Sequence, residues 1–412
     1  MQARSVFKKL LGWKDVAVKA VVIIAGSLVV DVRIASPHAH CSRCHRARRV
    51  YDRREARTWR HLDAGGVQWL IRYILRRVNC PTCGVVVEEV PWAEVGAWHT
   101  KDFEDEVAYR AQRTTKSDVV EQMQVGWDTV GNIVKRVMER LGPKDRLNGL
   151  THLGVDELSY SGQQYITLVY DHGGRGVVWS AIGKSKETLA QFFAELGPER
   201  CAAIQAVSMD MSRAYIEAVS AAVPHAVIVF DRFHLQKLCN EALDELRRQE
   251  VRAAGGPREA PWLKGLRWPL LKNSWNLDQD EKESLAQLQK VNHRLYRGHL
   301  LKDSLAHILS GRQWRVAEKR LKEWVTWAKR SRLAPFQRLA RTVQKHSVGI
   351  LAYVRTGLNN GLAEGINGKI RVVTKRSYGF RSVTNLIAMI FLCCSGLTLF
   401  PVQKTPDDSP TS

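Results

Sequence analysis

The sequence predicts a mixed α/β protein of several domains, and three observations carry this prediction. Short apolar segments alternate with helical patterns between residues 151 and 231. An almost wholly helical pattern follows, from residue 232 to about residue 344. Two Cys-x-x-Cys pairs and a helix-turn-helix pattern come before both regions. The chain has 412 residues, and at ~150 residues per domain this length predicts two to three domains.

The charge balance is strongly basic. Lys and Arg total 63 against 41 Asp and Glu, so the formal net charge is +22, which favours a polyanionic partner such as nucleic acid. Apolar residues make up 45% of the chain and 13 residues are Trp, which excludes wholesale disorder. The longest apolar runs, Val16 to Val30 and Leu386 to Phe400, stay below the ~18 uncharged residues of a membrane helix. We therefore expect a cytoplasmic protein with no membrane partner.

Four of the eight cysteines form two pairs near the N-terminus, Cys41 with Cys44 and Cys80 with Cys83. Disulfides are rare in a reducing cytosol, so this spacing predicts a tetrahedral zinc site. The 35 residues between the pairs exceed the ~15–20 of a simple zinc ribbon. A histidine could therefore replace one thiolate, and the nearby candidates are His38, His40, His45 and His61. Four protein ligands leave no open position, so we expect a structural site.

The segments around these cysteines have patterns of their own. Residues 14–34 are mostly apolar with a Gly26-Ser27 break, which predicts a β-hairpin. Residues 43–60 lie between the two pairs and hold eight Arg against two acids. A zinc-held finger could present this basic stretch to phosphate groups; the alternative is a solvated basic surface.

A helix-turn-helix pattern follows. One helix is expected over residues 100–114, and a short helix from residue 117 breaks at Gly126 before a second helix that ends near residue 141. Asp128 or Thr129 is the expected N-cap of the second helix. We expect this helix to enter a major groove of DNA. The exposed side chains predicted to contact bases or phosphates are Asn132, Lys135 and Arg136.

Five strands and two helices are predicted next. The strands are expected at residues 151–157, 164–171, 176–182, 203–210 and 226–231, and the helices at residues 187–196 and 212–223. Three strands, a helix, a strand, a helix and a strand is the order of an RNase H-like fold. In the helical segment that follows, residues 312–345 carry eleven Lys or Arg against two Glu, which predicts a basic face.

These patterns divide the chain into seven regions. We expect an N-terminal hairpin segment at 1–38, a zinc-binding module at 39–95, a helix-turn-helix domain at 96–147, the first part of the RNase H-like core at 148–240, an all-helical insertion at 241–344, the second part of the core at 345–400 and a disordered tail at 401–412.

Two acids end predicted strands of this core. Asp156 ends the first strand and Asp210 ends the fourth, and these strands are neighbours in an RNase H-like sheet. Two converging carboxylates repel each other unless a cation neutralises them, so the pair implies a hard, oxygen-ligated metal such as magnesium. The third acid is Glu364, in the first turn or so of a helix capped by Asn359 or Asn360.

Arg371 lies seven residues after Glu364, about two helical turns away and on the same face. Its guanidinium could bind the phosphate on which the metal acts. Asn367 could also contact nucleic acid.

Other polar residues compete for places in this site. Glu157 is the main rival of Asp156, although one step along a strand places it on the other face. Asp231 could join from the fifth strand or could instead cap the following helix. His234 is expected to pack or to face DNA, because two-metal chemistry does not require a base.

Several blocks of the chain resemble DDE transposases of bacterial insertion sequences, most closely the ISL-three family. The blocks are the cysteine pairs ending CPTCG, then RTWRHLD, GVDELSY, VSMDMSRAY, VIVFDRFH, NNGLAEGINGKIRVV and SYGFRSVTNLI. They run in the family's order and cover most of the chain. The resemblance implies a catalytic triad of Asp156, Asp210 and Glu364 in an RNase H-like core, with the family's basic residue at Arg371.

The resemblance also implies partners and chemistry. Two magnesium ions would support DNA strand cleavage and strand transfer, and zinc would be structural. Double-stranded DNA is the expected partner, both the terminal inverted repeats and the target, with the protein acting at the bacterial nucleoid. We expect a homodimer or a larger assembly on paired ends. The alternatives are a non-catalytic DNA-binding regulator and an RNase H-like nuclease without strand transfer.

Overall fold

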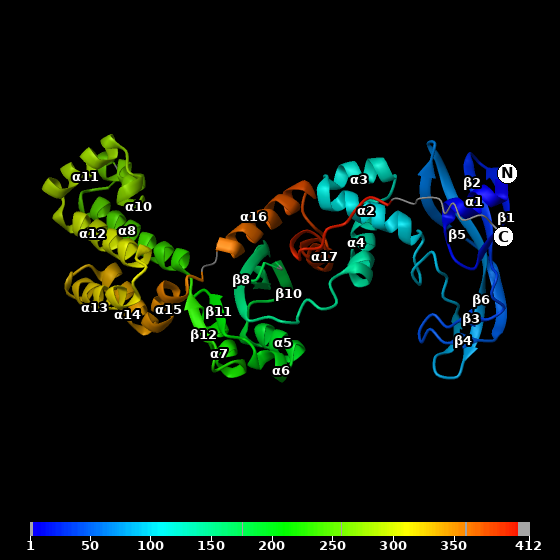
Figure 1. The fold of residues 1–412 in the computed structure, drawn as a ribbon. Coiled ribbons are helices and arrows are strands. Elements are labelled where there is room, and N and C mark those ends of the chain that lie inside the picture. The colour runs from blue at the N-terminus through cyan, green and yellow to red at the C-terminus, as the bar shows by residue number, and fades with distance from the viewer. Residues whose placement is uncertain (1–2, 175, 257, 359–360, 403–412) are drawn as a thin grey trace. The chain divides into compact units, whose positions relative to one another are not determined.

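The structure, a computed structural model, describes residues 3–174, 176–256, 258–358 and 361–402 (Figure 1). These residues form two compact units. The first contains the described parts of Met1–Pro143 and Ile370–Ser412, and the second contains those of Lys144–Lys369. Most of the predicted tail, residues 403–412, lies outside the described residues, as does the predicted helix cap at Asn359 or Asn360.

The first unit begins with a five-stranded sheet of order β1-β2-β6-β5, to which β7 adds on β6. Its elements are α1 (Ala3–Leu11), β1 (Val16–Ile24), β2 (Ser27–Ile34), β5 (Val50–Ala64), β6 (Val67–Cys80) and β7 (Gly84–Val87). The predicted hairpin over residues 14–34 is confirmed, since β1 and β2 pair antiparallel. Because β2 also pairs parallel with β6, this hairpin and the two long strands share one sheet. Trp59 and Trp92 are almost fully buried in its core.

Three helices follow the sheet, as predicted: α2 (Lys101–Arg113), α3 (Lys116–Met123) and α4 (Trp127–Leu141). Gln124 makes the turn between α3 and α4 in a left-handed conformation, with φ of 49°. The predicted N-cap of α4 was wrong, because Gly126 is the capping residue and no side chain caps the helix. Asp128 lies inside the first turn instead, where its charge interacts favourably with the helix dipole.

The C-terminal end of the chain returns to these helices. The last two helices are α16 (Gly361–Arg376) and α17 (Val383–Cys394), and α17 packs on α4 and α2. A methyl group at Gly131 of α4 would lie 2.4 Å from the Asn385 amide of α17, so the close approach of these helices requires glycine. Gln112 of α2 donates to the carbonyls of Leu392 and Leu397 at 2.6 and 2.7 Å.

The second unit contains a five-stranded sheet of order β10-β9-β8-β11-β12. Its strands are β8 (His152–Ser161), β9 (Gln164–Asp171), β10 (Gly176–Ile182), β11 (Ala206–Met209) and β12 (Val227–Phe230). β8, β9 and β10 pair antiparallel, whereas β8, β11 and β12 pair parallel. All five predicted strands exist. β8 is longer than predicted because it continues pairing with β9. β11 is shorter, because residues 203–205 form a turn and an irregular stretch after the short helix α6 (Pro198–Ala202).

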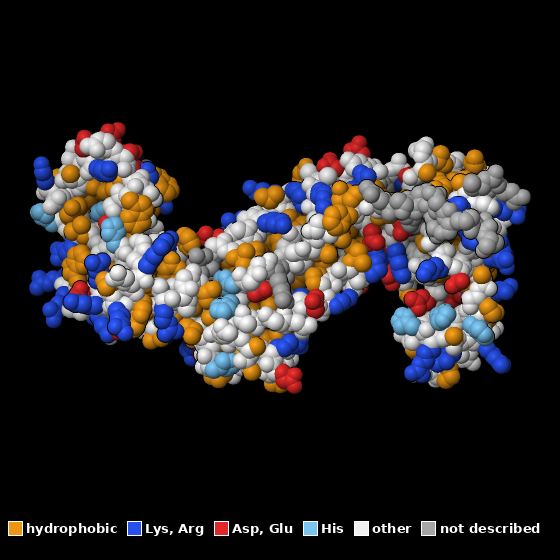
Figure 2. Space-filling model, in the orientation of Figure 1, with side chains coloured by type: hydrophobic (Ala, Val, Ile, Leu, Met, Phe, Trp, Pro, Cys, Tyr) orange, Lys and Arg blue, Asp and Glu red, His pale blue; other side chains and the backbone are white. Residues whose placement is uncertain are grey.

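Helices cover this sheet and then form a region of their own. α5 (Lys186–Leu196) and α7 (Arg213–Ala222) pack on each other beside the sheet. The helical region consists of α8 (Arg232–Ala253), α9 (Pro261–Gly265), α10 (Arg267–Leu271), the 3-10 turn Ser274–Asn276, α11 (Gln279–Val291), α12 (His293–Ser310), α13 (Trp314–Arg330), α14 (Ala334–Lys345) and α15 (Ser347–Thr356). One continuous apolar core joins the sheet to these helices. Figure 2 shows Lys and Arg side chains gathered over α13 and α14, as the sequence predicted.

Candidate functional site

Three carboxylates from distant parts of the chain line one cleft in the second unit. The cleft has a volume of about 710 Å³, and Asp156, Asp210 and Glu364 all contribute to its wall. The parallel register of β8 and β11 explains how the first two meet. Ser208 lies opposite Gly154, so two further residues along each strand bring Asp156 and Asp210 level with each other. Glu364 comes from the first turn of α16.

Asp156 is the most constrained of these acids. The backbone N–H of Glu157 donates to its Oδ1 at 2.8 Å, and the Asn367 amide donates to its Oδ2 at 2.6 Å. The pKa of Asp156 is raised to about 6, mainly by burial and less by the nearby charges of Asp210 and Asp231, while the two hydrogen bonds oppose this shift. A carboxylate whose charge is this unfavourable suits a cation, and carboxylate oxygens are the ligands that magnesium prefers.

Asp210 follows β11 directly. Its Oδ1 accepts a hydrogen bond from the Ser212 backbone N–H at 2.9 Å, which fixes the turn into α7. Only one oxygen is used in this way, so the other carboxylate oxygen can serve a ligand in the cleft. Glu364 is solvent-exposed on its helix and lies at the rim of the same cleft.

Two acids that the sequence left open also line the cleft. Asp231 caps α8 by accepting from the backbone N–H groups of Phe233 and His234 at 3.1 and 3.3 Å, and it faces the cleft as well. The helix-cap interpretation of Asp231 is therefore confirmed, and its part in the site stays a prediction. Glu157 also lines the cleft, and its carboxylate oxygen Oε1 lies 3.9 Å from Lys184 Nζ.

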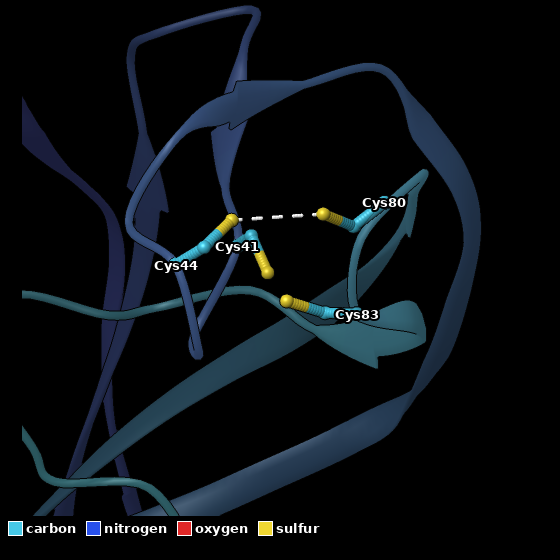
Figure 3. Close-up of side chains that lie close together, drawn as sticks. All are labelled: Cys41, Cys44, Cys80 and Cys83. Carbon is cyan, nitrogen blue, oxygen red and sulfur yellow. Dashed lines mark hydrogen bonds between the residues drawn. The ribbon is translucent and has the colours of Figure 1, made fainter.

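The four paired cysteines form a second candidate site, in the first unit. The sulfur atoms of Cys41, Cys44, Cys80 and Cys83 all lie within 4.8 Å of one another, and in Figure 3 the thiols converge. Cys41 and Cys44 lie around the turn between β3 (Ala39–His40) and β4 (Ala47–Arg48), while Cys80 ends β6 and Cys83 directly precedes β7. The long antiparallel pair β5–β6 brings these ends together, which explains the unusual separation of the two pairs.

The chemistry of this cluster fits zinc. Among the described residues the cluster contains cysteines only: His45 pairs with Glu89 at 2.7 Å, and His61 is buried against Thr100 at 2.9 Å. Arg48 donates to Cys80 Sγ at 3.5 Å, and this hydrogen bond is the main reason that the pKa of Cys80 falls to about 5. A lowered pKa favours the thiolate, which is the form that binds zinc.

The helix α4 presents only part of its predicted contact surface. Asn132 and Lys135 are exposed, as predicted. The prediction that Arg136 is exposed was wrong, because its Nε and Nη2 donate to Glu104 Oε1 at 2.9 and 2.6 Å. Glu104 has no solvent exposure, and burial raises its pKa while Arg136 and Arg140 oppose the shift. Arg136 therefore has a structural partner inside the unit.

Comparisons with known proteins agree with this geometry. A family model of DDE transposases, described as "Transposase", matches residues 153–390, which include Asp156, Asp210 and Glu364. The chain belongs to the ISL3 transposase family. A second model, "Helix-turn-helix domain of transposase family ISL3", matches residues 88–138 and so covers α2, α3 and most of α4.

Named relatives extend over most of this transposase. The transposase for insertion sequence element IS1557 of Mycobacterium tuberculosis is 39% identical over 86% of this chain and 86% of the relative. The transposase for insertion sequence element IS1001 of Bordetella parapertussis is 31% identical over 74% of this chain and 76% of the relative. No described helix of the transposase is long and apolar enough to cross a membrane.

The structure adds residues that sequence reasoning missed in the transposase cleft. Its wall includes four polar side chains of α8 that continue the row begun by His234: Lys237, Glu241, Asp244 and Arg248. Steps of three or four residues keep these side chains on one helix face, and that spacing is the signal that could have found them. Arg267 of α10 joins them, so the helical region supplies basic groups to the cleft.

Arg371 lies on α16, seven residues after Glu364. Seven residues are close to two turns, so both side chains share one face of the helix, and both are exposed. Arg371 makes no ion pair within the described ranges of the chain.

Proposed function

We propose that this transposase binds the terminal inverted repeats of its insertion sequence, cleaves the DNA at their ends and joins the freed ends to target DNA. The observation that carries the proposal is the meeting of Asp156, Asp210 and Glu364 in one cleft. These acids come from β8, the end of β11 and α16, which lie far apart in the sequence. A DDE transposase implies a divalent metal, and this donor set fits one.

We propose that the sheet is an RNase H-like core. Three antiparallel strands followed by two parallel strands, with helices after β10 and β11, support this proposal. The helical insertion, residues 241–344, begins within α8 and then interrupts the core before α15 and α16. The proposed regions keep the boundaries expected from the sequence: 1–38, 39–95, 96–147, 148–240, 241–344, 345–400 and 401–412.

The proposed roles follow from charge and position. Asp156, Asp210 and Glu364 would hold two magnesium ions. Bound magnesium would activate the attacking oxygen and stabilise the leaving 3′ oxygen at the scissile phosphate. Arg371 would bind a phosphate through two parallel hydrogen bonds, which a planar guanidinium provides.

DNA recognition would come from the first unit. Asn132 and Lys135 of α4 are exposed and suit contacts in a major groove. The cysteine cluster would hold structural zinc and so fix the base of the arginine-rich strand β5. The exposed arginines of this stretch are Arg43, Arg46, Arg49, Arg53 and Arg54. They suit sequence-independent phosphate contacts that position the duplex.

One experiment separates this proposal from its alternatives. The purified transposase is incubated with a labelled terminal repeat, an unlabelled target duplex and Mg²⁺, Mn²⁺ or a chelator. We expect metal-dependent nicking at the repeat end and a slower-migrating joined product. Nicking without joining would indicate a nuclease, and repeat binding without any nicking would indicate a regulator. Two copies are expected to act together on paired ends, which the size of the nicked complex would show.

A further inference from the structure

Asn367 connects the helix that carries Glu364 with the strand that carries Asp156. It lies three residues after Glu364 on α16, and its Nδ2 donates to Asp156 Oδ2 at 2.6 Å. The backbone N–H of Glu157 holds the other oxygen, Oδ1, at 2.8 Å. Each oxygen of the Asp156 carboxylate therefore has one donor. Rotation of the carboxylate about its Cβ–Cγ bond would break both hydrogen bonds.

The other end of the Asn367 amide is unsatisfied. Its Oδ1 is buried and has no hydrogen-bond donor among the described residues. The orientation of the amide is fixed by its partner, because an amide oxygen facing an ionised carboxylate would be repelled. A buried acceptor without a partner costs about 1–3 kcal/mol, so the arrangement is maintained at the expense of this oxygen.

We infer that Asn367 is a positioning residue for the cation site of the cleft. Its amide N–H sets the rotation of the Asp156 carboxylate and holds the first turns of α16, with Glu364, against β8. Replacing a residue that holds a metal-binding side chain in place typically weakens metal binding by about 10–100-fold. This inference rests on the proposed divalent-cation site.

The test measures cation binding directly, with Mn²⁺ as the probe and free Mn²⁺ followed by electron paramagnetic resonance. The Asn367→Ala variant of the full chain removes the donor and the acceptor. Asn276→Ala is the matched control, because Asn276 is an exposed asparagine of the helical region outside the cleft. We expect Asn367→Ala to weaken Mn²⁺ binding by about 10-fold or more, the lower end of the range for such residues, and the control to bind as the parent does.

A double-mutant cycle separates positioning from other effects. If Asn367 acts through Asp156, adding Asn367→Ala to Asp156→Asn causes no further loss of Mn²⁺ affinity. Asn367→Gln, which keeps the amide donor, should retain more Mn²⁺ affinity than Asn367→Ala. The inference would be overturned if Asn367→Ala reduced Mn²⁺ affinity by the same factor in the parent chain and in Asp156→Asn. The inference would also be overturned if Asn367→Ala unfolded at lower temperature yet bound Mn²⁺ with unchanged affinity. That result is expected of a purely structural contact.

The same measurements keep this inference distinct from the proposed function. Unchanged Mn²⁺ binding by Asp156→Asn would contradict the proposed cation site itself. Reduced binding by Asp156→Asn together with normal binding by Asn367→Ala would contradict only the role of Asn367.

Discussion

Replacing Arg136 with alanine should destabilise the first unit without removing a DNA phosphate contact. The Arg136 guanidinium holds Glu104 through two hydrogen bonds, and its side chain is 27% exposed while Glu104 is fully buried. The substitution leaves a buried carboxylate with one remaining cation, since Arg140 Nη1 lies 3.7 Å from Glu104 Oε2. Arg140 is shared with Glu94 and Asp105, so it compensates only in part.

The size of the effect follows from this geometry. Removing one partner of a buried ion pair costs about 3–5 kcal/mol, and the remaining contact with Arg140 favours the lower end, ~3 kcal/mol. In a unit of this size each kcal/mol lowers the unfolding temperature by about 2–4 °C, which gives roughly 6–12 °C. Glu104 has a pKa raised by burial, and loss of Arg136 raises that pKa further. The stability deficit should therefore be largest at neutral pH and shrink as the pH falls and Glu104 becomes protonated.

Lys135→Ala is the matched comparison. Lys135 is the preceding residue on α4, is exposed and lies 3.9 Å from Glu139 in a surface pair. Thermal unfolding and hydrogen exchange of α2 and α4 in the full chain measure stability, and the salt dependence of repeat binding counts phosphate contacts. We expect Arg136→Ala to lower stability and to leave the salt dependence of repeat binding unchanged. We expect Lys135→Ala to change stability by no more than about 0.5 kcal/mol and to lower the slope of that salt dependence by about one. The opposite pattern would refute this assignment of Arg136.

Three further predictions concern chemistry and metal binding. Asp156→Asn, Asp210→Asn and Glu364→Gln should each abolish repeat cleavage yet leave repeat binding nearly intact, because binding energy comes from other residues; near-normal cleavage by one variant would remove that residue from the site. The purified full chain should contain one equivalent of zinc. Cys80→Ser should lose the zinc, and the backbone amides of β7 should then exchange hydrogen faster. A metal-free parent whose β7 amides stay protected from exchange would contradict the zinc assignment. Arg371→Lys should slow cleavage about 10-fold, equivalent to ~1.4 kcal/mol, with folding and Mn²⁺ binding unchanged, and a less stable but fully active variant would show a structural role instead.

Local patterns were sufficient for much of the fold. The strands β9 and β10 lie where alternation and turn signals predicted them, and the cysteine pairs converge as their spacing indicated. The two carboxylates of β8 and β11 meet because neighbouring strands follow from element order. Each of these features depends on residues close in sequence or on a recurrent arrangement of strands.

What the sequence did not reveal depends on contacts between distant residues. The pairing of Arg136 with Glu104 joins two helices, and nothing local distinguishes this arginine from the exposed Lys135. The hydrogen bond from Asn367 to Asp156 spans 211 residues. The packing of α17 on α4 could not be predicted either. An apolar helix indicates that it is buried, but its sequence does not show against which other element it packs.

The return of the C-terminal helix to α4 has a consequence for protein synthesis. A ribosome makes α2, α3 and α4 early, but the helix that covers α4 is made only near the end of the chain. Products of premature termination therefore expose an apolar face and invite proteolysis, and pulse-chase labelling of chains truncated before Val383 should show shorter lifetimes than the full chain. Truncated chains would then be degraded before they bind DNA ends, so the protein bound to these ends would be full-length.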